Sequence, residues 1–203
     1  MNHPAVNPPK SREVTINSER YELIAFYYPD RDTAWDTIYQ GQFLANFYPC
    51  MITLTINGIT GSFLTAEAAF QATKWWNNAA DRAQFEGAKT GSDAFHIKNG
   101  LSNPDNSYAG LGRDGAMKEV LTQKFADPSF QQALLLTGEA YLLEHNEKQG
   151  RDNYWSDDHD GSGANMLGKT LMEVREACGG AAAPSGNYTV ADFTARVEID
   201  ALS

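Results

Sequence analysis

The segment MITLTINGITGSFLTAEAAFQATKWW (residues 51–76) changes from the pattern of a β-hairpin to that of a helix. Residues 51–56 and 59–63 are rich in β-branched and large apolar side chains, as strands are. Asn57-Gly58 separates them, and this dipeptide suits a type I′ turn because both positions accept a positive φ angle. Thr65 then precedes an alanine-rich stretch and can cap a helix. The segment therefore predicts a hairpin followed directly by a helix.

The pattern on either side of this segment indicates one more strand and several helices. YELIAFYY (21–28) is rich in aromatic and branched residues, which favours a strand. Apolar residues recur at helical spacing in the second half of the chain, and Pro128 is placed to open a helix. We therefore expect an α+β fold, mostly helical, with a small sheet or hairpin near the N-terminus. The segments expected to be helical are GAMKEVLTQKF (115–125), SFQQALLLTGEAYLLEH (129–145) and NMLGKTLMEVREA (165–177).

The ends of the chain differ in composition from its middle. Residues 1–12 contain three prolines and almost no apolar side chains, so we expect a disordered lead-in. Residues 13–178 are expected to form a single domain. The last stretch, 179–203, begins with the linker-like GGAAAPSG and continues with an alternation of apolar and polar residues over 193–199, which predicts a strand. Because this extension follows the last motif, deleting residues 181–203 is expected to leave turnover near normal.

The overall charge and composition exclude several classes of protein. The chain has 203 residues and a net charge of −10, from 16 Lys and Arg against 26 Asp and Glu. This charge disfavours general binding to duplex DNA, although a compact basic pocket can still exist within an acidic surface. No apolar run is long enough to span a membrane, no secretory signal is evident, and the two cysteines match no zinc or disulfide spacing. We expect a soluble cytoplasmic protein that does not associate with membranes.

Glu67, Gln71 and Lys74 form the first candidate site. Their spacing puts the three side chains on one face of the predicted helix. A carboxylate and a lysine on one face can serve as general base and cation in a cleft. The alternative, favoured by spacing alone, is a solvated polar face without function.

The loop NYWSDDHDGSGAN (153–165) is the second candidate. Trp155 could stack on a base, and Asp157 could hold a hydroxyl or a water molecule. The loop does not match a calcium-binding loop, and it matches a phosphate-binding glycine loop only weakly. A surface turn around a buried tryptophan is the favoured alternative from composition. The four histidines show no ligand spacing, so we expect neither a metal nor another cofactor.

Five segments, in order, resemble the NADAR, or YbiA-like, family, and the resemblance covers roughly Gln42 to Arg175. The resemblance implies a compact, mostly helical α+β domain and the hydrolysis of N-glycosidic bonds. Substrates in this family are early intermediates of riboflavin synthesis, which are ribosylamino-pyrimidine phosphates, or ADP-ribosylated guanine, so that modification by ADP-ribose is reversed. The segments are FLANFYPC (43–50), AEAAFQATK (66–74), KEVLTQKF (118–125), LLLTGEAYLLE (134–144) and YWSDDHDGSGANMLGKTLMEVR (154–175).

The resemblance assigns roles to individual residues by their position in these motifs. It implies Glu67 as the main catalytic carboxylate, Asp157 or Glu144 as a second acid, and Lys74 as a cation or as an amine that forms an imine with ribose C1. The residues implied in substrate binding are Asn46, Phe47, Gln71, Arg113, Glu144, Trp155, Asn165 and Gly168.

Four positions depart from the family pattern. Ala68 stands where a histidine is common, Lys98-Asn99 where Gly-Arg is common, and Ser156 where a glycine is usual. The tryptophan expected just before Arg113 is absent, and Tyr108 is the nearest aromatic residue. These departures leave a second reading open, in which the protein is a catalytically impaired module that binds ADP-ribose or NAD.

Overall fold

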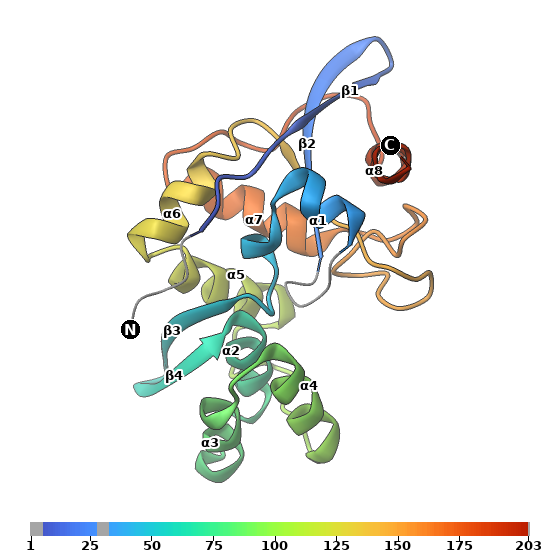
Figure 1. The fold of residues 1–203 in the computed structure, drawn as a ribbon. Helices are drawn as coiled ribbons and strands as arrows, with labels where there is room; N and C mark the ends of the chain where they lie inside the picture. Colours follow the sequence, from blue (N-terminus) through green and yellow to red (C-terminus); the bar gives the residue numbers. More distant parts are fainter. Residues whose placement is uncertain (1–5, 28–32, 203) are drawn as a thin grey trace. The chain divides into compact units, whose positions relative to one another are not determined.

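The computed structural model describes residues 6–27 and 33–202, and the contacts of the chain fall into two compact units. Unit 1 comprises residues 46–127 of the described part, and unit 2 comprises residues 6–45 together with 128–202. Figure 1 shows the elements of both, and each unit is described by itself below.

Unit 1 is built on the predicted hairpin. Strands β3 (Pro49–Ile56) and β4 (Ile59–Thr65) pair antiparallel, and the turn residues Asn57 and Gly58 have φ angles of 52° and 76°. These values confirm the expected turn with two positive φ angles. Helix α2 begins where β4 ends (Figure 1), because the Thr65 side chain accepts a hydrogen bond from the Ala68 N–H and caps the helix.

The helical segment that follows the hairpin is buried against it. Trp76 is 1% exposed, and its indole N–H donates to the Ile56 carbonyl at 3.0 Å, which ties the end of the helical segment to the hairpin. The predicted helix over 115–125 is confirmed as α5, which buries Met117, Val120 and Leu121. The helical elements of unit 1 are α2 (Ala66–Ala72), the 3₁₀ turn η2 (Thr73–Trp75), α3 (Ala79–Gly87), α4 (Gly91–Gly100) and α5 (Arg113–Lys124).

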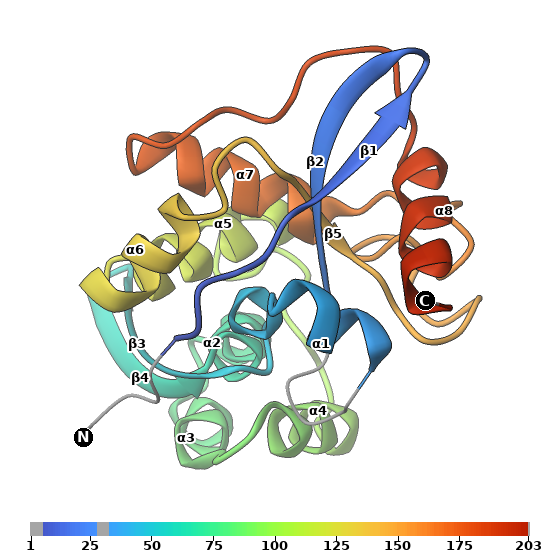
Figure 2. The same ribbon diagram turned by 45° about the horizontal axis from the view of Figure 1, so that its top comes forward.

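Unit 2 contains a three-stranded sheet in the order β1-β2-β5. Strand β2 (Glu19–Phe26) lies between β1 (Arg12–Ile16), to which it is antiparallel, and β5 (Tyr141–Glu144), to which it is parallel (Figure 2). The predicted strand near residue 21 is confirmed as far as Phe26, and Tyr28 lies outside the described residues. The sheet therefore joins the start of the chain to a segment more than one hundred residues later.

The predicted helix over 129–145 is only half correct. Helix α6 (Pro128–Leu135) opens at the proline as expected, but Gly138 has a φ of 58°, which ends the helical path. Residues 141–144 then form β5, whose first three side chains are buried. A short apolar run fits a buried parallel strand as well as a helix, and pairing with β2 decides between them.

The remaining helices of unit 2 cover the sheet. The predicted helix over 165–177 is confirmed as α7, which packs closely on β5, since a Cβ atom on Gly168 would lie 2.0 Å from the Leu142 carbonyl oxygen. The helical elements of unit 2 are α1 (Ala34–Tyr39), the 3₁₀ turn η1 (Gln42–Leu44), α6 (Pro128–Leu135), α7 (Met166–Ala177) and α8 (Val190–Ala201).

The strand predicted over 193–199 is wrong, because these residues lie within helix α8. Phe193 and Val197, four residues apart, are fully buried, whereas Ile199 is 60% exposed, which fits a helical period and not a period of two. Thr189 and Asp192 form a capping box at the start of the helix.

The α+β fold class is confirmed, and helices predominate among the described residues. The predicted domain boundaries stay predictions. Of the expected lead-in, residues 1–5 lie outside the described part, residues 6–11 form neither helix nor strand, and the Lys10 N–H donates to the Tyr39 carbonyl at 2.7 Å. In the described part of the chain, no helix has the length and apolar character that crossing a membrane requires.

Arg175, on α7, is a buried cation that joins three segments of unit 2. Its side chain is 0% exposed and donates to the Thr137 hydroxyl and to the carbonyl oxygens of Ala140, Ala181 and Ala182. The guanidinium thus holds the linker after α7 against the turn before β5.

We predict that Arg175→Lys destabilises the protein by about 3 kcal/mol, because one ammonium cannot reach four acceptors that lie in a fork. Thermal unfolding should show a decrease in Tm of about 6–12 °C for a chain of this size. The control is Arg20→Lys, at an arginine whose side chain is 77% exposed, which should stay within about 0.5 kcal/mol of wild type. Equal melting temperatures for the two variants would contradict this role.

Candidate functional site

Glu67, Gln71 and Lys74 form a continuous row of hydrogen bonds in unit 1. The Gln71 side-chain amide donates to Glu67 Oε1 at 2.8 Å, and Lys74 Nζ donates to Gln71 Oε1 at 2.9 Å. Glu67 is 8% exposed and Gln71 is 6% exposed, so the alternative of a solvated polar face is wrong. A carboxylate kept largely from water, with a cation at the other end of the row, is an arrangement that acid–base chemistry can use.

The aromatic rings of Phe70 and Tyr108 stack beside this row, with centroids 5.5 Å apart. Lys74 Nζ lies 5.5 Å and 5.4 Å from the two centroids, within reach of a cation–π interaction. Tyr108, the nearest aromatic residue to the position where the family has a tryptophan, therefore lies beside Phe70 and Lys74.

The pKa of Lys74 is lowered, first by burial, which disfavours the charged form, and then by the nearby charge of Lys98. The charge of Glu67 acts in the opposite direction. A lowered pKa increases the fraction of neutral amine, and the neutral amine is the form that attacks a carbonyl carbon.

Lys74 also stands at a pocket of about 240 Å³ in unit 1. Its lining combines polar side chains with tryptophan rings and includes Lys74, Trp75, Asn78, Asn103 and Asp105. The Trp75 indole N–H donates to the Ser102 carbonyl at 2.8 Å, which holds one wall of the pocket in place.

The other predicted residues of unit 1 occupy different environments. Asn46 is 8% exposed, its amide nitrogen faces Met117 Sδ at 3.6 Å, and its buried Oδ1 has no hydrogen-bond partner in the structure. Phe47 packs on Gly91, where a Cβ atom would lie 2.3 Å from the ring. Arg113 is the first residue of α5, is about half exposed, and contacts Asp114 at 3.5 Å.

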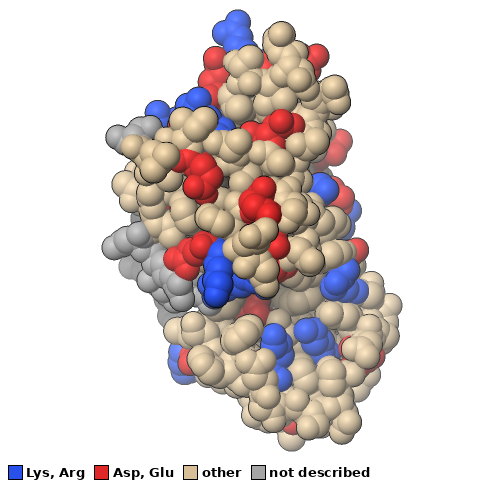
Figure 3. Space-filling model, turned by 90° about the vertical axis from the view of Figure 1, so that its right-hand side faces the viewer, with Lys and Arg blue, Asp and Glu red and all other residues tan. Residues whose placement is uncertain are grey.

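Basic side chains are grouped locally despite the acidic composition. On the face drawn in Figure 3, Lys and Arg side chains (blue) and acidic side chains (red) both form separate small patches, and several blue side chains lie together in the lower part of the view. Lys74 and Lys98 are close enough for one to lower the pKa of the other. The net charge of −10 therefore does not prevent a locally cationic surface.

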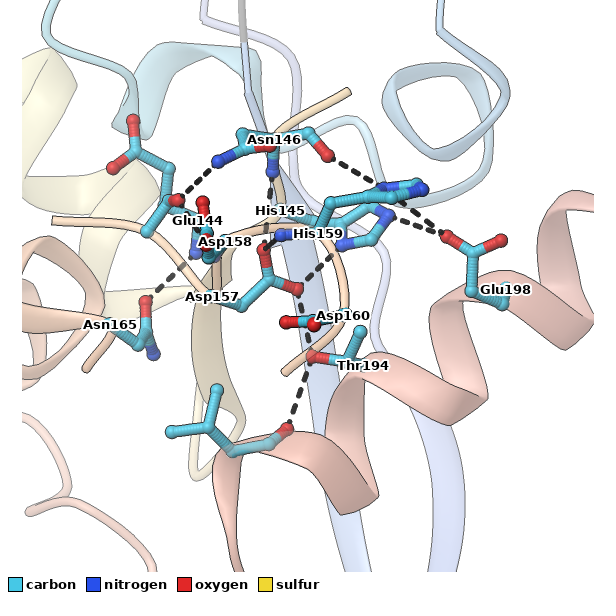
Figure 4. Close-up of polar contacts among 12 residues, drawn as sticks. Glu144, His145, Asn146, Asp157, Asp158, His159, Asp160, Asn165, Thr194 and Glu198 are labelled. Atoms are coloured by element: carbon cyan, nitrogen blue, oxygen red, sulfur yellow. Dashed lines mark hydrogen bonds and ion pairs between the residues drawn. The ribbon is translucent and has the colours of Figure 1, made fainter. Parts of the chain in front are cut away.

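Asp157 organises the loop over 153–165 in unit 2 (Figure 4). Its carboxylate is 0% exposed and accepts four hydrogen bonds. The donors are His145 Nδ1 at 2.6 Å, the Thr194 hydroxyl at 2.8 Å, and the backbone N–H groups of His159 and Asn146 at 2.8 Å and 3.3 Å. Both carboxylate oxygens are thus engaged within unit 2.

His145 links Asp157 to helix α8. Its second ring nitrogen, Nε2, contacts Glu198 Oε1 at 2.9 Å, and the ring of Trp35 packs edge-on against it with centroids 4.6 Å apart. His145, His159 and Glu198 also present possible metal-ligand atoms within 4.8 Å of one another. His159 Nδ1 contacts the Asn146 carbonyl at 3.0 Å, so an ion at this place would have to displace existing hydrogen bonds.

Glu144, Trp155, Asn165 and Gly168 also lie in unit 2. Trp155 is half-buried, contacts Tyr154 edge-on, and its backbone N–H donates to Asp152 Oδ1. Glu144 ends β5, and its backbone bonds to the Asn165 side chain and to the Asp157 N–H. Asn165 is fully buried and also donates to Tyr141 and to the Leu142 carbonyl.

The predicted residues thus belong to two groups, one in each unit. In unit 1 the structure joins Glu67, Gln71 and Lys74 directly, while in unit 2 it joins Glu144, Asp157 and Asn165 through backbone and side-chain contacts. Sequence analysis missed His145, Thr194 and Glu198 as partners of Asp157. Nothing in their spacing indicates this cluster, which forms only when α8 meets the loop. The substrate-binding roles of Asn165 and Gly168 stay predictions, and the structure also gives both residues roles in packing.

Comparison with known proteins identifies several relatives. The chain is 32% identical over 155 residues to a riboflavin biosynthesis protein of Vibrio vulnificus, an alignment that covers 75% of this chain but only 38% of that protein. It is 34% identical over 113 residues to N-glycosidase YbiA of Escherichia coli, covering 55% of this chain and 68% of the relative. The NMR structure of E. coli YbiA matches with a TM-score of 0.59 and 27% identity, over 77% of this chain and 84% of that one.

The family model of the NADAR domain matches residues 30–178, which include every predicted site residue in both units. The structural match to YbiA extends over a similar share of the chain. With its motifs, its fold and this match in agreement, the chain belongs to the NADAR domain family.

Proposed function

We propose that this protein is an N-glycosidase, a hydrolase that cleaves the bond between a ribose anomeric carbon and a base nitrogen. The observation that carries the proposal is the row of buried Glu67, buried Gln71 and half-buried Lys74 within a NADAR domain. The name of the relative YbiA, N-glycosidase, supports the same reaction class.

Glu67 is the proposed catalytic carboxylate. Cleavage of an N-glycosidic bond develops positive charge on the ribose ring, and a carboxylate held near C1 stabilises that charge. Water then adds to C1, its proton passes to the carboxylate, and the departing base keeps the bonding electrons and takes up a proton. Gln71 holds Glu67 Oε1 at 2.8 Å and so fixes the orientation of the carboxylate.

Lys74 is proposed to bind a substrate phosphate, with Arg113 as a second cation. The proposed substrates are an ADP-ribosyl compound, such as ADP-ribosylated guanine, or a ribosylamino-pyrimidine phosphate. Both classes carry phosphate next to ribose, which suits a cation beside the catalytic acid. The substrate is thus a small nucleotide-like molecule, and neither metal nor other cofactor takes part in the proposed steps.

The environment of Asp157 argues for a supporting role in its loop. Both its oxygens already accept hydrogen bonds from inside unit 2. Glu144 is only partly buried, and its role as a second acid stays a prediction.

The competing function is a module that binds ADP-ribose or NAD without cleaving it. Two of the departures from the family pattern do not support this binding-only function, because both side chains are buried. Ala68 is 0% exposed and Ser156 is 1% exposed. The Ser156 hydroxyl lies 2.7 Å from the Asn146 side-chain nitrogen and 3.0 Å from the Asp158 N–H, so it serves the loop structure.

The two functions are separated by incubating the purified protein with ADP-ribosylated guanosine and, separately, with ribosylaminouracil phosphate. With water, an N-glycosidase converts the first compound to guanosine and ADP-ribose, and the second to the free aminouracil and ribose phosphate, which mass spectrometry detects. A binding module shows saturable binding by calorimetry with the compound recovered intact, and that result would contradict the proposal.

We predict that Glu67→Gln reduces turnover by about 10²–10⁴-fold, because the amide keeps the shape of the side chain but cannot accept a proton. Binding and Tm should change little. The matched control is Glu119→Gln on α5, where Glu119 accepts from Gln123 at 3.0 Å with the same spacing of four residues. Full activity in Glu67→Gln would exclude Glu67 as the catalytic acid.

For Lys74, the prediction separates an electrostatic role from a covalent one. A phosphate-binding cation is replaceable, so Lys74→Arg should retain much of the activity, and borohydride added during turnover should trap nothing. The lowered pKa of Lys74 supports the other mechanism, in which an imine with ribose C1 would be reduced to a stable adduct at this residue. Lys98→Arg is the control, and peptide mass mapping locates any adduct.

Trp155 is predicted to be a ligand contact, since its half-buried ring has a flat face to offer. Trp155→Ala should weaken ligand binding by about 1–3 kcal/mol if the ring stacks on a base. Calorimetry measures the affinity, and Tyr154→Ala, at the neighbouring ring, is the control. A large decrease in Tm with unchanged affinity would instead identify Trp155 as a core anchor.

A further inference from the structure

Helix α8 lies beyond the NADAR match, which ends at residue 178, and yet it is firmly attached to unit 2. The Phe193 ring stacks on Tyr141 of β5 with centroids 4.1 Å apart and planes 5° apart. The Tyr39 hydroxyl donates to Asp200 Oδ2 at 2.6 Å, which joins the end of α8 to α1. The extension is therefore an integral part of unit 2.

A second side of α8 carries polar contacts to the loop. Thr194 and Glu198 are four residues apart, so they lie on one helical face, adjacent to the buried pair Phe193 and Val197. The Thr194 hydroxyl lies 2.8 Å from Asp157 Oδ2, and Glu198 Oε1 lies 2.9 Å from His145 Nε2 (Figure 4). Because His145 Nδ1 contacts the same Asp157 oxygen at 2.6 Å, the four side chains form one connected row, with Thr194 and the half-exposed Glu198 at its two ends.

This row of four side chains acts on the backbone of the loop through Asp157. The Asp157 N–H donates to the Glu144 carbonyl, and the Asp157 carbonyl accepts from the N–H groups of Gly161 and Gly163. Asp158 and His159, which follow, have φ angles of 57° and 72°, a conformation unfavourable for residues with side chains. The loop thus needs outside contacts to hold it, and α8 supplies two of them.

We propose that Thr194 and Glu198 are positioning residues, which hold the Asp157–His145 pair and through it the loop that carries Trp155. The catalytic consequence rests on the proposed N-glycosidase function, whereas the effect on the loop does not. Deletion of residues 181–203 is then expected to reduce turnover, contrary to the expectation from sequence.

The first test is Thr194→Val, which keeps the shape of the side chain and removes the hydroxyl. Hydrogen exchange of the Asp157, Gly161 and Gly163 amides should become faster, while exchange in β2 stays as in wild type. With ADP-ribosylated guanosine and ribosylaminouracil phosphate as substrates, kcat/KM should fall by about 10–100-fold, the scale of a small misplacement of site residues. Thr194→Ser restores the hydroxyl and should restore both measurements.

The matched control is Thr122→Val on α5, because the Thr122 hydroxyl donates at 2.8 Å to a carbonyl of its own helix. For the second contact, Glu198→Ala should loosen the same amides, and Glu176→Ala, at an exposed residue of α7, should not. A merely structural role for α8 would lower Tm in these variants and leave kcat/KM of the folded protein unchanged.

The outcomes distinguish this proposal from the proposed function. If wild-type protein cleaves neither substrate but Thr194→Val still loosens the loop, the N-glycosidase function fails and the positioning of the loop stands. If wild-type protein is active and Thr194→Val leaves both amide exchange and kcat/KM unchanged, the positioning role is wrong. If Thr194→Val speeds hydrogen exchange of the loop amides but leaves kcat/KM unchanged, the proposed effect of the loop on catalysis is wrong.

Discussion

The carboxylate of Asp157 is completely buried, and hydrogen bonds from four donors compensate for the loss of its contact with water. A buried charge without hydrogen-bond partners would destabilise the folded protein by several kcal/mol. The fold of this region therefore requires the four donors, and the fold in turn brings them together. The donors come from the segment after β5, from the loop itself and from α8. The arrangement of unit 2 around β5 therefore depends on this one buried carboxylate, to which the sheet, the loop and the C-terminal helix are all connected.

Glu67 in unit 1 is also largely buried, but its surroundings differ. Its Oε1 accepts from Gln71, and the row continues to Lys74, whose pKa is lowered by burial. Here the row of polar groups ends in a cation beside a pocket, whereas the Asp157 carboxylate is surrounded by its four donors. The two carboxylates thus lie in different environments, which fits the chemical role proposed for Glu67 and the structural role proposed for Asp157.

The region that matches the NADAR domain and helix α8, which follows it, have different parts in the proposed function. Residues 30–178 contain the motifs on which the proposed chemistry rests. Helix α8 follows this region and contacts the Asp157–His145 pair directly. A NADAR domain that has gained such a helix can keep its reaction, while the conformation of the loop over 153–165 comes to depend on α8. A loop with strained backbone angles is sensitive to the loss of the contacts that hold it.

Local patterns in the sequence determined much of this protein. Asn57-Gly58 specified the hairpin, and Thr65 specified the start of α2. The spacing of Glu67, Gln71 and Lys74 specified that they share one face. Turns, caps and shared faces depend only on neighbours within a few residues. The tertiary structure decided the rest. Residues 141–144 form a strand only because they pair with β2. Residues 193–199 alternate like a strand but form a helix, because Phe193 and Val197 pack into a core and Ile199 does not. Asp157 contacts His145 and Thr194, which lie 12 and 37 positions away in the sequence. No local pattern encodes such contacts, which exist only when distant segments pack together.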